Sequence, residues 1–215
     1  MRSKIGILGS GIVAKMLGAG FIKHGHEVML GTRTASKLDE WKSASGGKVG
    51  TFEEAAAFGD VLVLAAKGTI AAEVMQLAKE KNINGKTVID TTNPIADLPP
   101  VNNVMSFFTD RNDSLLERLQ KEFPEVHFVK AYNSVGSAHM VNPDFGGITP
   151  TMFICGNNDE AKKTVTEINT AFGWETEDCG TAEAARAIEP LCILWCIPGF
   201  NGKGWNHAFK LLRNN

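Results

Sequence analysis

The sequence predicts an α/β fold in which a doubly wound, mainly parallel sheet is followed by a helical extension at the C-terminal end. Short apolar runs alternate with helical patterns along most of the chain, and this alternation is typical of a parallel sheet. A glycine-rich turn directly follows the first apolar run and opens an apolar-periodic helix. Strand, turn and helix in this order predict a sheet of the Rossmann type.

Six short apolar runs are the expected strands. The runs at residues 61–65 and 87–90 are apolar on both faces, so we expect them in the interior of the sheet, covered by helices on each side. Helical stretches or loops separate most of the runs, as the crossovers of a parallel sheet require. In chain order the expected strands are residues 5–8, 27–30, 61–65, 87–90, 126–129 and 152–155.

The pattern changes after about residue 157. A helix is expected over residues 159–171, then a short strand over 175–177 and a long helical segment from residue 182 onward. Pro190 and Pro198 should break or kink that last segment, because proline cannot continue the hydrogen-bond ladder of a helix. We expect residues 1–157 to form the cofactor-binding domain, and residues 158–215 to pack on it as an extension that does not fold alone.

Charge and hydropathy exclude several classes of protein. The formal net charge is -2 and no basic run occurs, so we expect no nucleic-acid partner. The apolar stretch at residues 191–198 is far shorter than the roughly 20 residues of a membrane-spanning helix, and the first apolar run is too short for a signal peptide. We therefore expect a cytoplasmic protein without membrane contact. The four cysteines lack metal-ligand spacing, so no metal is expected; Cys192 and Cys196 share a helical face, as packing groups or as a redox pair.

The glycine-rich turn matches the dinucleotide-binding pattern Gly-x-Gly-x-x-Ala in its strand-turn-helix context. Gly9 permits the tight turn, Gly11 lets the backbone approach a pyrophosphate, and Ala14 lets the helix pack closely on the strand. The phosphates are expected at the helix N-terminus, where free N–H groups favour an anion. From this turn we predict that Gly9, Ser10, Gly11, Ile12 and Val13 bind the cofactor.

The end of the second strand indicates which dinucleotide binds. A cofactor with a free ribose 2′-hydroxyl calls for Asp or Glu at this point, and hydroxyls and cations stand there instead. The guanidinium of Arg33 can hold phosphate oxygens, Thr32 and Thr34 can donate hydroxyls, and Lys37 adds a charge, so NADP(H) is the expected cofactor. Thr34 as a helix cap and Lys37 as a solvated surface residue remain open as alternatives.

Two further loops follow central strands, at the sheet edge where open α/β sheets bind ligands. Small residues there leave room for the nicotinamide ribose. Lys67 is the one charged group in this row, and it either contacts the pyrophosphate or ribose or is an exposed loop lysine. From these loops we predict that Ala65, Ala66, Lys67, Thr92, Asn93 and Pro94 bind the cofactor.

These segments together resemble a known family, the NADP oxidoreductases typified by the 8-hydroxy-5-deazaflavin:NADPH reductases, which depend on coenzyme F420. The family is also similar to the cytosolic domain of six-transmembrane epithelial ferric reductases. The resemblance covers nearly the whole chain. It is carried by Gly9-x-Gly11-x-x-Ala14, Gly31-Thr32-Arg33, Asp90-Thr91-Thr92-Asn93-Pro94, Lys130-Ala131-Tyr132-Asn133-Ser134-Val135-Gly136, Phe153-Ile154-Cys155-Gly156 and Gly199-Phe200-Asn201-Gly202.

The resemblance implies hydride transfer from NADPH to a small redox acceptor, a deazaflavin or a flavin as second substrate. It also implies that Asn133 and Val135 face the nicotinamide. Residues 133–136 depart from the His-Thr-Ile-Pro-like segment of the archaeal reductases and are more similar to the ferric reductase domains, so the acceptor stays open. Such a transfer between stacked rings needs proximity and exclusion of water rather than a side-chain acid, so no catalytic residue is assigned.

Two other functions remain open. A carbonyl or imine reductase would need an acid, for which the candidates are Tyr132, Lys67, His139 and His207, the last on the expected C-terminal helix. A non-catalytic NADPH sensor would bind the cofactor without a second substrate. Large apolar residues near the C-terminal end could line a ring-shaped pocket or form the interface of a homodimer, which we expect. These residues are Leu191, Ile193, Leu194, Trp195, Ile197, Phe200 and Trp205.

Overall fold

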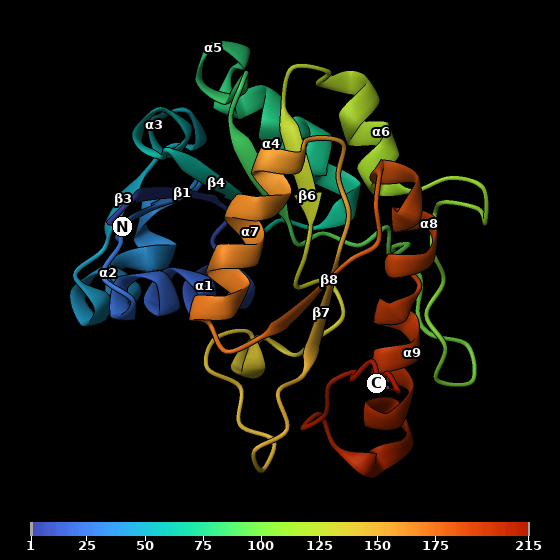
Figure 1. Cartoon of the computed structure of the whole chain (residues 1–215). Helices are drawn as coiled ribbons and strands as arrows, with labels where there is room; N and C mark the ends of the chain where they lie inside the picture. The colour runs from blue at the N-terminus through green and yellow to red at the C-terminus, as the bar shows by residue number, and fades with distance from the viewer. Residues whose placement is uncertain (1, 215) are drawn as a thin grey trace.

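The computed structural model describes residues 2–214 and confirms the Rossmann-type α/β fold (Figure 1). A six-stranded parallel sheet has the order β3-β2-β1-β4-β5-β6, so the strand order reverses between β1 and β4 at its centre. Its strands are β1 (Lys4–Leu8), β2 (Glu27–Gly31), β3 (Lys48–Gly50), β4 (Val61–Leu64), β5 (Thr87–Asp90) and β6 (His127–Lys130). Every neighbouring pair is parallel.

Helices cover both faces of this sheet. One apolar cluster joins the sheet to α1 and α7 through Leu17, Phe21 and Val165, and the other joins it to α3, α4 and α6. Ile7 and Leu62 are fully buried, which explains why the central strands are apolar on both faces. The helices are α1 (Ile12–Lys23), α2 (Asp39–Ser45), α3 (Phe52–Phe58), α4 (Ala71–Ala78), α5 (Glu80–Ile83), α6 (Leu115–Glu122), α7 (Asp159–Ala171), α8 (Ala185–Ile188) and α9 (Leu191–Pro198).

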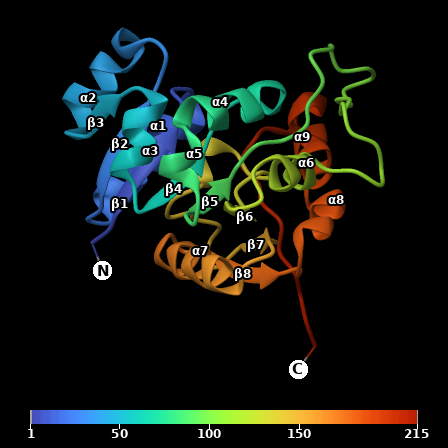
Figure 2. The same cartoon turned by 90° about the horizontal axis from the view of Figure 1, so that it is seen from above.

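The apolar run at residues 152–155 forms a strand outside the main sheet. It is β7 (Thr151–Ile154), and it pairs in parallel with β8 (Glu175–Asp178) to form a separate two-stranded sheet. Helix α7 connects the two strands, so the unit is a compact βαβ crossover (Figure 2). A single antiparallel bridge between Lys130 and Cys155 joins it to β6. The boundary expected at residue 157 therefore falls inside this unit.

The end of the chain is less helical than the sequence pattern suggests. Pro190 separates α8 from α9, and Pro198 ends α9, as predicted. One π turn follows, and Gly202 and Gly204 then adopt positive φ of 77° and 82°, which stops the helix. The placement of His207 on a C-terminal helix is therefore wrong, because residues 204–214 are neither helix nor strand. Within this tail the Phe209 carbonyl accepts a hydrogen bond from the Thr151 amide. None of the helices in residues 2–214 has the length and apolarity needed to cross a bilayer.

Candidate functional site

A cavity of about 800 Å³ opens at the carboxyl ends of β1, β2, β4 and β5. It lies at the reversal of strand order, where open α/β sheets bind their ligands. Of the predicted cofactor-binding residues, the cavity brings together Gly9, Ser10, Gly11, Ile12, Val13, Thr32, Arg33, Thr34, Lys37, Ala65, Ala66, Lys67, Thr92 and Asn93. Pro94, Asn133 and Val135 do not line it. The wall is completed by Gly68 and Thr91, which lie within the two predicted binding loops, and by residues that no sequence pattern indicated: Phe52, Thr69, Ile70, Val74, Ile95 and Asp97.

The two glycines of the first turn have different physical roles. A Cβ on Gly9 would lie 2.1 Å from the Ala65 carbonyl oxygen, so this glycine allows the end of β1 to approach the loop after β4. Close approach, rather than a positive φ, is what requires glycine there. A Cβ on Gly11 would meet no atom of the described residues within 4 Å. Gly11 is the N-cap of α1 and supplies no side-chain cap, so the first N–H groups of the helix remain open for an anion.

The turn after β2 carries the cationic end of the cavity. Thr32 is buried; its hydroxyl accepts from the Thr34 amide at 3.1 Å and donates to the Thr34 carbonyl at 3.3 Å, which fixes the turn. Thr34 occupies the N-cap position of the short helix Ala35–Leu38, but its side chain makes no capping hydrogen bond. Arg33 lies beside it with an exposed guanidinium, whose Nη1 is 3.1 Å from Glu73 Oε1 on α4.

A second ion pair lies in the loops after β4 and β5. Lys67 Nζ is 3.1 Å from Asp97 Oδ1, and both residues line the cavity with largely exposed side chains. Such exposed pairs contribute little to folding stability, typically about 0–1 kcal/mol. Arg33 and Lys67 are therefore each paired with a carboxylate from another loop or helix, and each can exchange that partner for an anionic group.

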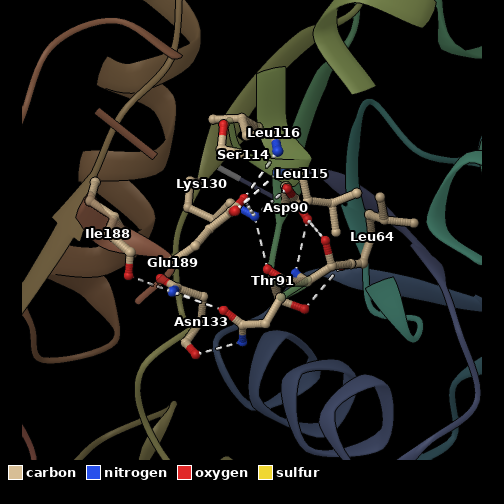
Figure 3. Close-up of polar contacts among 12 residues, drawn as sticks. Leu64, Asp90, Thr91, Ser114, Leu115, Leu116, Lys130, Asn133, Ile188 and Glu189 are labelled. Atoms are coloured by element: carbon tan, nitrogen blue, oxygen red, sulfur yellow. Dashed lines mark hydrogen bonds and ion pairs between the residues drawn. The ribbon is translucent and has the colours of Figure 1, made fainter. Parts of the chain in front are cut away.

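A buried charge cluster lies behind the cavity (Figure 3). Lys130 Nζ, fully buried at the end of β6, is 2.6 Å from Asp90 Oδ2 and 2.9 Å from Glu189 Oε1. Burial alone lowers the pKa of Lys130, but the attraction of Asp90 and Glu189 outweighs it and holds this pKa above its ordinary value, so the amine is charged. Glu189 also accepts hydrogen bonds from the backbone amides of Leu115 and Leu116, each at 3.0 Å, at the start of α6.

The sequence contained a partial signal for this cluster. Asp90 and Lys130 are the last residues of two apolar strands, and they stand opposite one another in the register of β5 and β6. An acid and a base at the ends of adjacent buried strands predict an ion pair, because neither is tolerated alone in the interior. Glu189 gave no such signal: it precedes Pro190 in a segment whose position relative to β6 depends on the tertiary fold.

The cluster and two asparagines support the loop after β5. Asn93 Nδ2 donates to the Asn133 carbonyl at 2.8 Å, and Asn133 Nδ2 donates to Asn93 Oδ1 at 3.1 Å. Asn133 Nδ2 also donates to the Ile188 carbonyl at 3.0 Å, so it joins the cavity wall to α8. Asn133 is thus placed directly behind Asn93, while Val135 belongs to the apolar cluster beneath.

Of the four candidate acids, only Lys67 lines the cavity. Tyr132 is buried at 1% exposure, its hydroxyl has no hydrogen-bond partner among residues 2–214, and burial raises its pKa. His139 ends the short helix Ser137–His139, as expected for a short helical stretch. The His207 ring stacks on Trp195 with centroids 5.0 Å apart, and its Nε2 is 2.8 Å from the Trp195 carbonyl oxygen.

Three of the C-terminal apolar residues, Trp195, Phe200 and Trp205, form an aromatic cluster. Trp195 lies 5.4 Å from Trp205 between ring centroids, and Phe200 meets Trp205 edge to face at 5.3 Å. A Cβ on Gly136 would be 3.1 Å from the Trp195 ring, so the loop after β6 packs closely on this cluster. Cys192 and Cys196, expected as packing groups or as a redox pair, are free, buried thiols that pack in one cluster with Trp195.

One family model matches the N-terminal part of the chain. Residues 4–94 match the family described as NADP oxidoreductase coenzyme F420-dependent. Two curated relatives are metalloreductase STEAP3 from Rattus norvegicus, 30% identical over 200 residues, and the F420-dependent NADP reductase of Methanocaldococcus jannaschii, 29% identical over 144 residues. The alignments cover 91% and 66% of this chain but 38% and 63% of those proteins, so the chain spans less than two thirds of either.

A solved structure extends the similarity to the whole chain. A protein of Arthrobacter sp. FB24, provisionally described as an F420-dependent NADP reductase, superposes with a TM-score of 0.92 at 28% identity. The superposition covers 98% of this chain and 100% of that one. The C-terminal segment, including α8, α9 and the tail, therefore has a counterpart in a protein of the same size.

Proposed function

We propose that the chain, whose residues 4–94 match the family NADP oxidoreductase coenzyme F420-dependent, is an NADP(H)-dependent oxidoreductase. Its reaction is the transfer of a hydride between NADP(H) and a deazaflavin or flavin-like acceptor. The observation that carries the proposal is one continuous cavity that contains Gly11 at a helix N-terminus, Arg33 at one end and Thr92 at the other.

The chemistry of the cavity fits the cofactor. The absence of any atom of the described chain within 4 Å of a Gly11 Cβ leaves space beside the start of α1, where open N–H groups can receive the pyrophosphate. Arg33, Thr34 and Lys37 supply the cation and donors that suit a 2′-phosphate. No acid of the kind that holds a free 2′-hydroxyl follows β2, although Glu73 approaches Arg33 from α4.

This assignment fixes the direction of the cofactor. With the 2′-phosphate at Arg33 and the pyrophosphate at Gly11, the nicotinamide end lies at Thr91, Thr92 and Asn93. Bound NADPH would supply the hydride, and the protein's part is to bind, orient and exclude water. The loop after β5, held by the hydrogen bonds between Asn93 and Asn133, orients the ring. Ile95 in the same loop lines the cavity and packs against the apolar cluster that contains Trp195.

The acceptor is tested by steady-state oxidation of NADPH. We expect turnover with a deazaflavin, FMN or FAD, and no turnover with simple imines or carbonyls. Lys67→Met separates the reaction classes, because proton transfer by a side chain typically contributes about 10²–10⁴-fold to turnover. A loss of that size with an imine or carbonyl, while NADPH binding is retained, would make Lys67 a general acid and favour an imine or carbonyl reductase.

A binding titration is the second arm of this test. We expect NADPH to bind more than about tenfold more tightly than NADH, since charge-assisted hydrogen bonds to the 2′-phosphate are absent for NADH. NADPH binding without oxidation by any acceptor of the panel would instead favour a non-catalytic sensor. Equal affinity for the two cofactors at moderate salt would contradict the assignment of the 2′-phosphate to Arg33.

A further inference from the structure

Thr92 has all three of its polar groups held by buried charged side chains. Its amide and its hydroxyl both donate to Asp90 Oδ1, at 2.8 and 2.7 Å, and its carbonyl oxygen accepts from Lys130 Nζ at 2.8 Å. Asp90 and Lys130 are fully buried. Because water does not reach these contacts, the two charges determine the position of Thr92 and of the cavity wall on either side of it.

The cluster contains two carboxylates, Asp90 and Glu189, and a single ammonium, that of Lys130. A buried ion group of this kind carries a desolvation penalty that well-packed apolar residues would avoid. Glu189 is offset in part by the N-terminus of α6, whose first amides it accepts. Folding alone therefore does not account for this arrangement, whereas a need to hold one loop rigidly does.

We propose that Lys130, held between Asp90 and Glu189, is a positioning residue for the nicotinamide end of the cofactor, acting through Thr92. This inference rests on the proposed NADP(H) function, because that function places the nicotinamide at Thr92. Glu189 comes from the connection between α8 and α9, so the C-terminal extension becomes part of the support of the cofactor site.

The test uses two isosteric variants of the full chain, Asp90→Asn and Glu189→Gln. Each leaves Lys130 paired with one carboxylate, so neither creates an uncompensated buried charge. Affinities are measured for NADPH and for 2′,5′-ADP, a fragment with the 2′-phosphate but no nicotinamide. A net hydrogen bond is worth about fivefold in affinity. We therefore expect the affinity for NADPH to fall about fivefold in Asp90→Asn and in Glu189→Gln, and the affinity for 2′,5′-ADP to stay unchanged. The fluorescence of the bound reduced nicotinamide should change as well.

Glu53→Gln is the matched control. It removes a carboxylate from the exposed pair between Glu53 on α3 and Lys81 on α5, which shares no hydrogen bond with Lys130, Asp90 or Glu189, so it should leave both affinities and the fluorescence unchanged. If Asp90→Asn does not fold, Glu189→Gln and Thr92→Val test the positioning role instead. Thr92→Val removes one hydrogen bond to Asp90 and no charge.

The outcomes separate the inference from the proposed function. An equal loss of NADPH and 2′,5′-ADP affinity would reveal a general structural effect and overturn the positioning role. Unchanged NADPH affinity and fluorescence in the variants that fold would overturn it too. Failure of the unmodified protein to bind either ligand would instead reject the NADP(H) function on which the inference stands.

Discussion

Arg33 follows β2 at the end of the cavity where the adenosine of the cofactor is proposed to lie. Its forked guanidinium can bind phosphate oxygens in a way that a ribose hydroxyl cannot reproduce. Because its side chain is 62% exposed, we expect Arg33→Ala to weaken NADPH at the lower end of the range for hydrogen bonds to charged groups, about 1.5–3 kcal/mol, and to leave NADH unaffected. Titration with both cofactors measures this difference; a similar loss for both would place Arg33 away from the 2′-phosphate.

Glu73 opposes the same phosphate. Its carboxylate lies 3.1 Å from Arg33 Nη1, so a 2′-phosphate that binds Arg33 must displace it and then lies near a like charge. We expect Glu73→Gln to strengthen NADPH binding by up to about fivefold, the scale of an exposed ion pair, with no gain for NADH. The gain should shrink as salt rises. Glu80→Gln on the exposed surface of α5 is the control, and weaker NADPH binding by Glu73→Gln would show that Glu73 supports the site instead.

Local sequence was sufficient for one half of this site. The hydroxyls and cations after β2 are consecutive in the chain, so their residue types alone predicted a 2′-phosphate site, and the structure places them in one cavity wall. Glu73 and Glu189 could not be found in this way. Each forms an ion pair with a basic residue that is distant in the sequence. A periodic pattern within one segment does not predict which side chains of two distant segments come into contact. Pairing of this kind is a property of the tertiary fold.

The turn between β1 and α1 allows a test of where the pyrophosphate binds. A side chain on Gly11 meets no atom of residues 2–214 within 4 Å, so Gly11→Val should fold with nearly unchanged thermal stability. Its side chain would occupy the space in which the pyrophosphate approaches the helix, and we expect NADPH and NADH binding to be lost together. Circular dichroism and titration test both halves, and retained micromolar affinity would contradict the proposed position of the pyrophosphate.

Gly9→Ala is expected to lower the stability of the fold, in contrast to Gly11→Val. Its Cβ would lie 2.1 Å from the Ala65 carbonyl oxygen, which belongs to the backbone and cannot rotate away. We therefore expect this smaller substitution to destabilise the fold by about 1–3 kcal/mol, the usual cost of overpacking a well-filled interior. A denaturant titration measures it. Stability equal to that of the unmodified protein would mean that β1 and the loop after β4 separate easily.

Elements with strong local patterns were predicted correctly, and those defined by partners were not. The expected strands at 5–8 and 87–90 match β1 and β5 because their apolar runs are bounded by turn residues. The edge strand β3 was missed, since its three residues Lys48–Gly50 have no alternation of their own. The pairing of β7 with β8 was also missed, because a short strand does not record in its sequence which sheet it joins.

Several contacts bind the C-terminal extension to the preceding part of the chain. Glu189 reaches Lys130, Asn133 donates to the Ile188 carbonyl, and the tail hydrogen-bonds to Thr151 in β7. Two of these contacts are buried and polar, so separating the extension would expose charges that are paired only in the assembled molecule. The whole chain is therefore expected to behave as one cooperative unit, in line with the prediction that residues 158–215 do not fold alone.

Thermal unfolding tests this expectation on the whole molecule. We expect a single calorimetric transition whose calorimetric and van't Hoff enthalpies agree. NADPH at 100 times its Kd stabilises the folded state by about 2.7 kcal/mol, which for a chain of this length raises Tm by roughly 5–10 °C, and the single transition should move as a unit. NADH at the same concentration should raise Tm less, because it lacks the 2′-phosphate. Two transitions, of which only the first responds to NADPH, would show that the extension unfolds independently and that the contact of Glu189 with Lys130 does not couple it to the cofactor cavity.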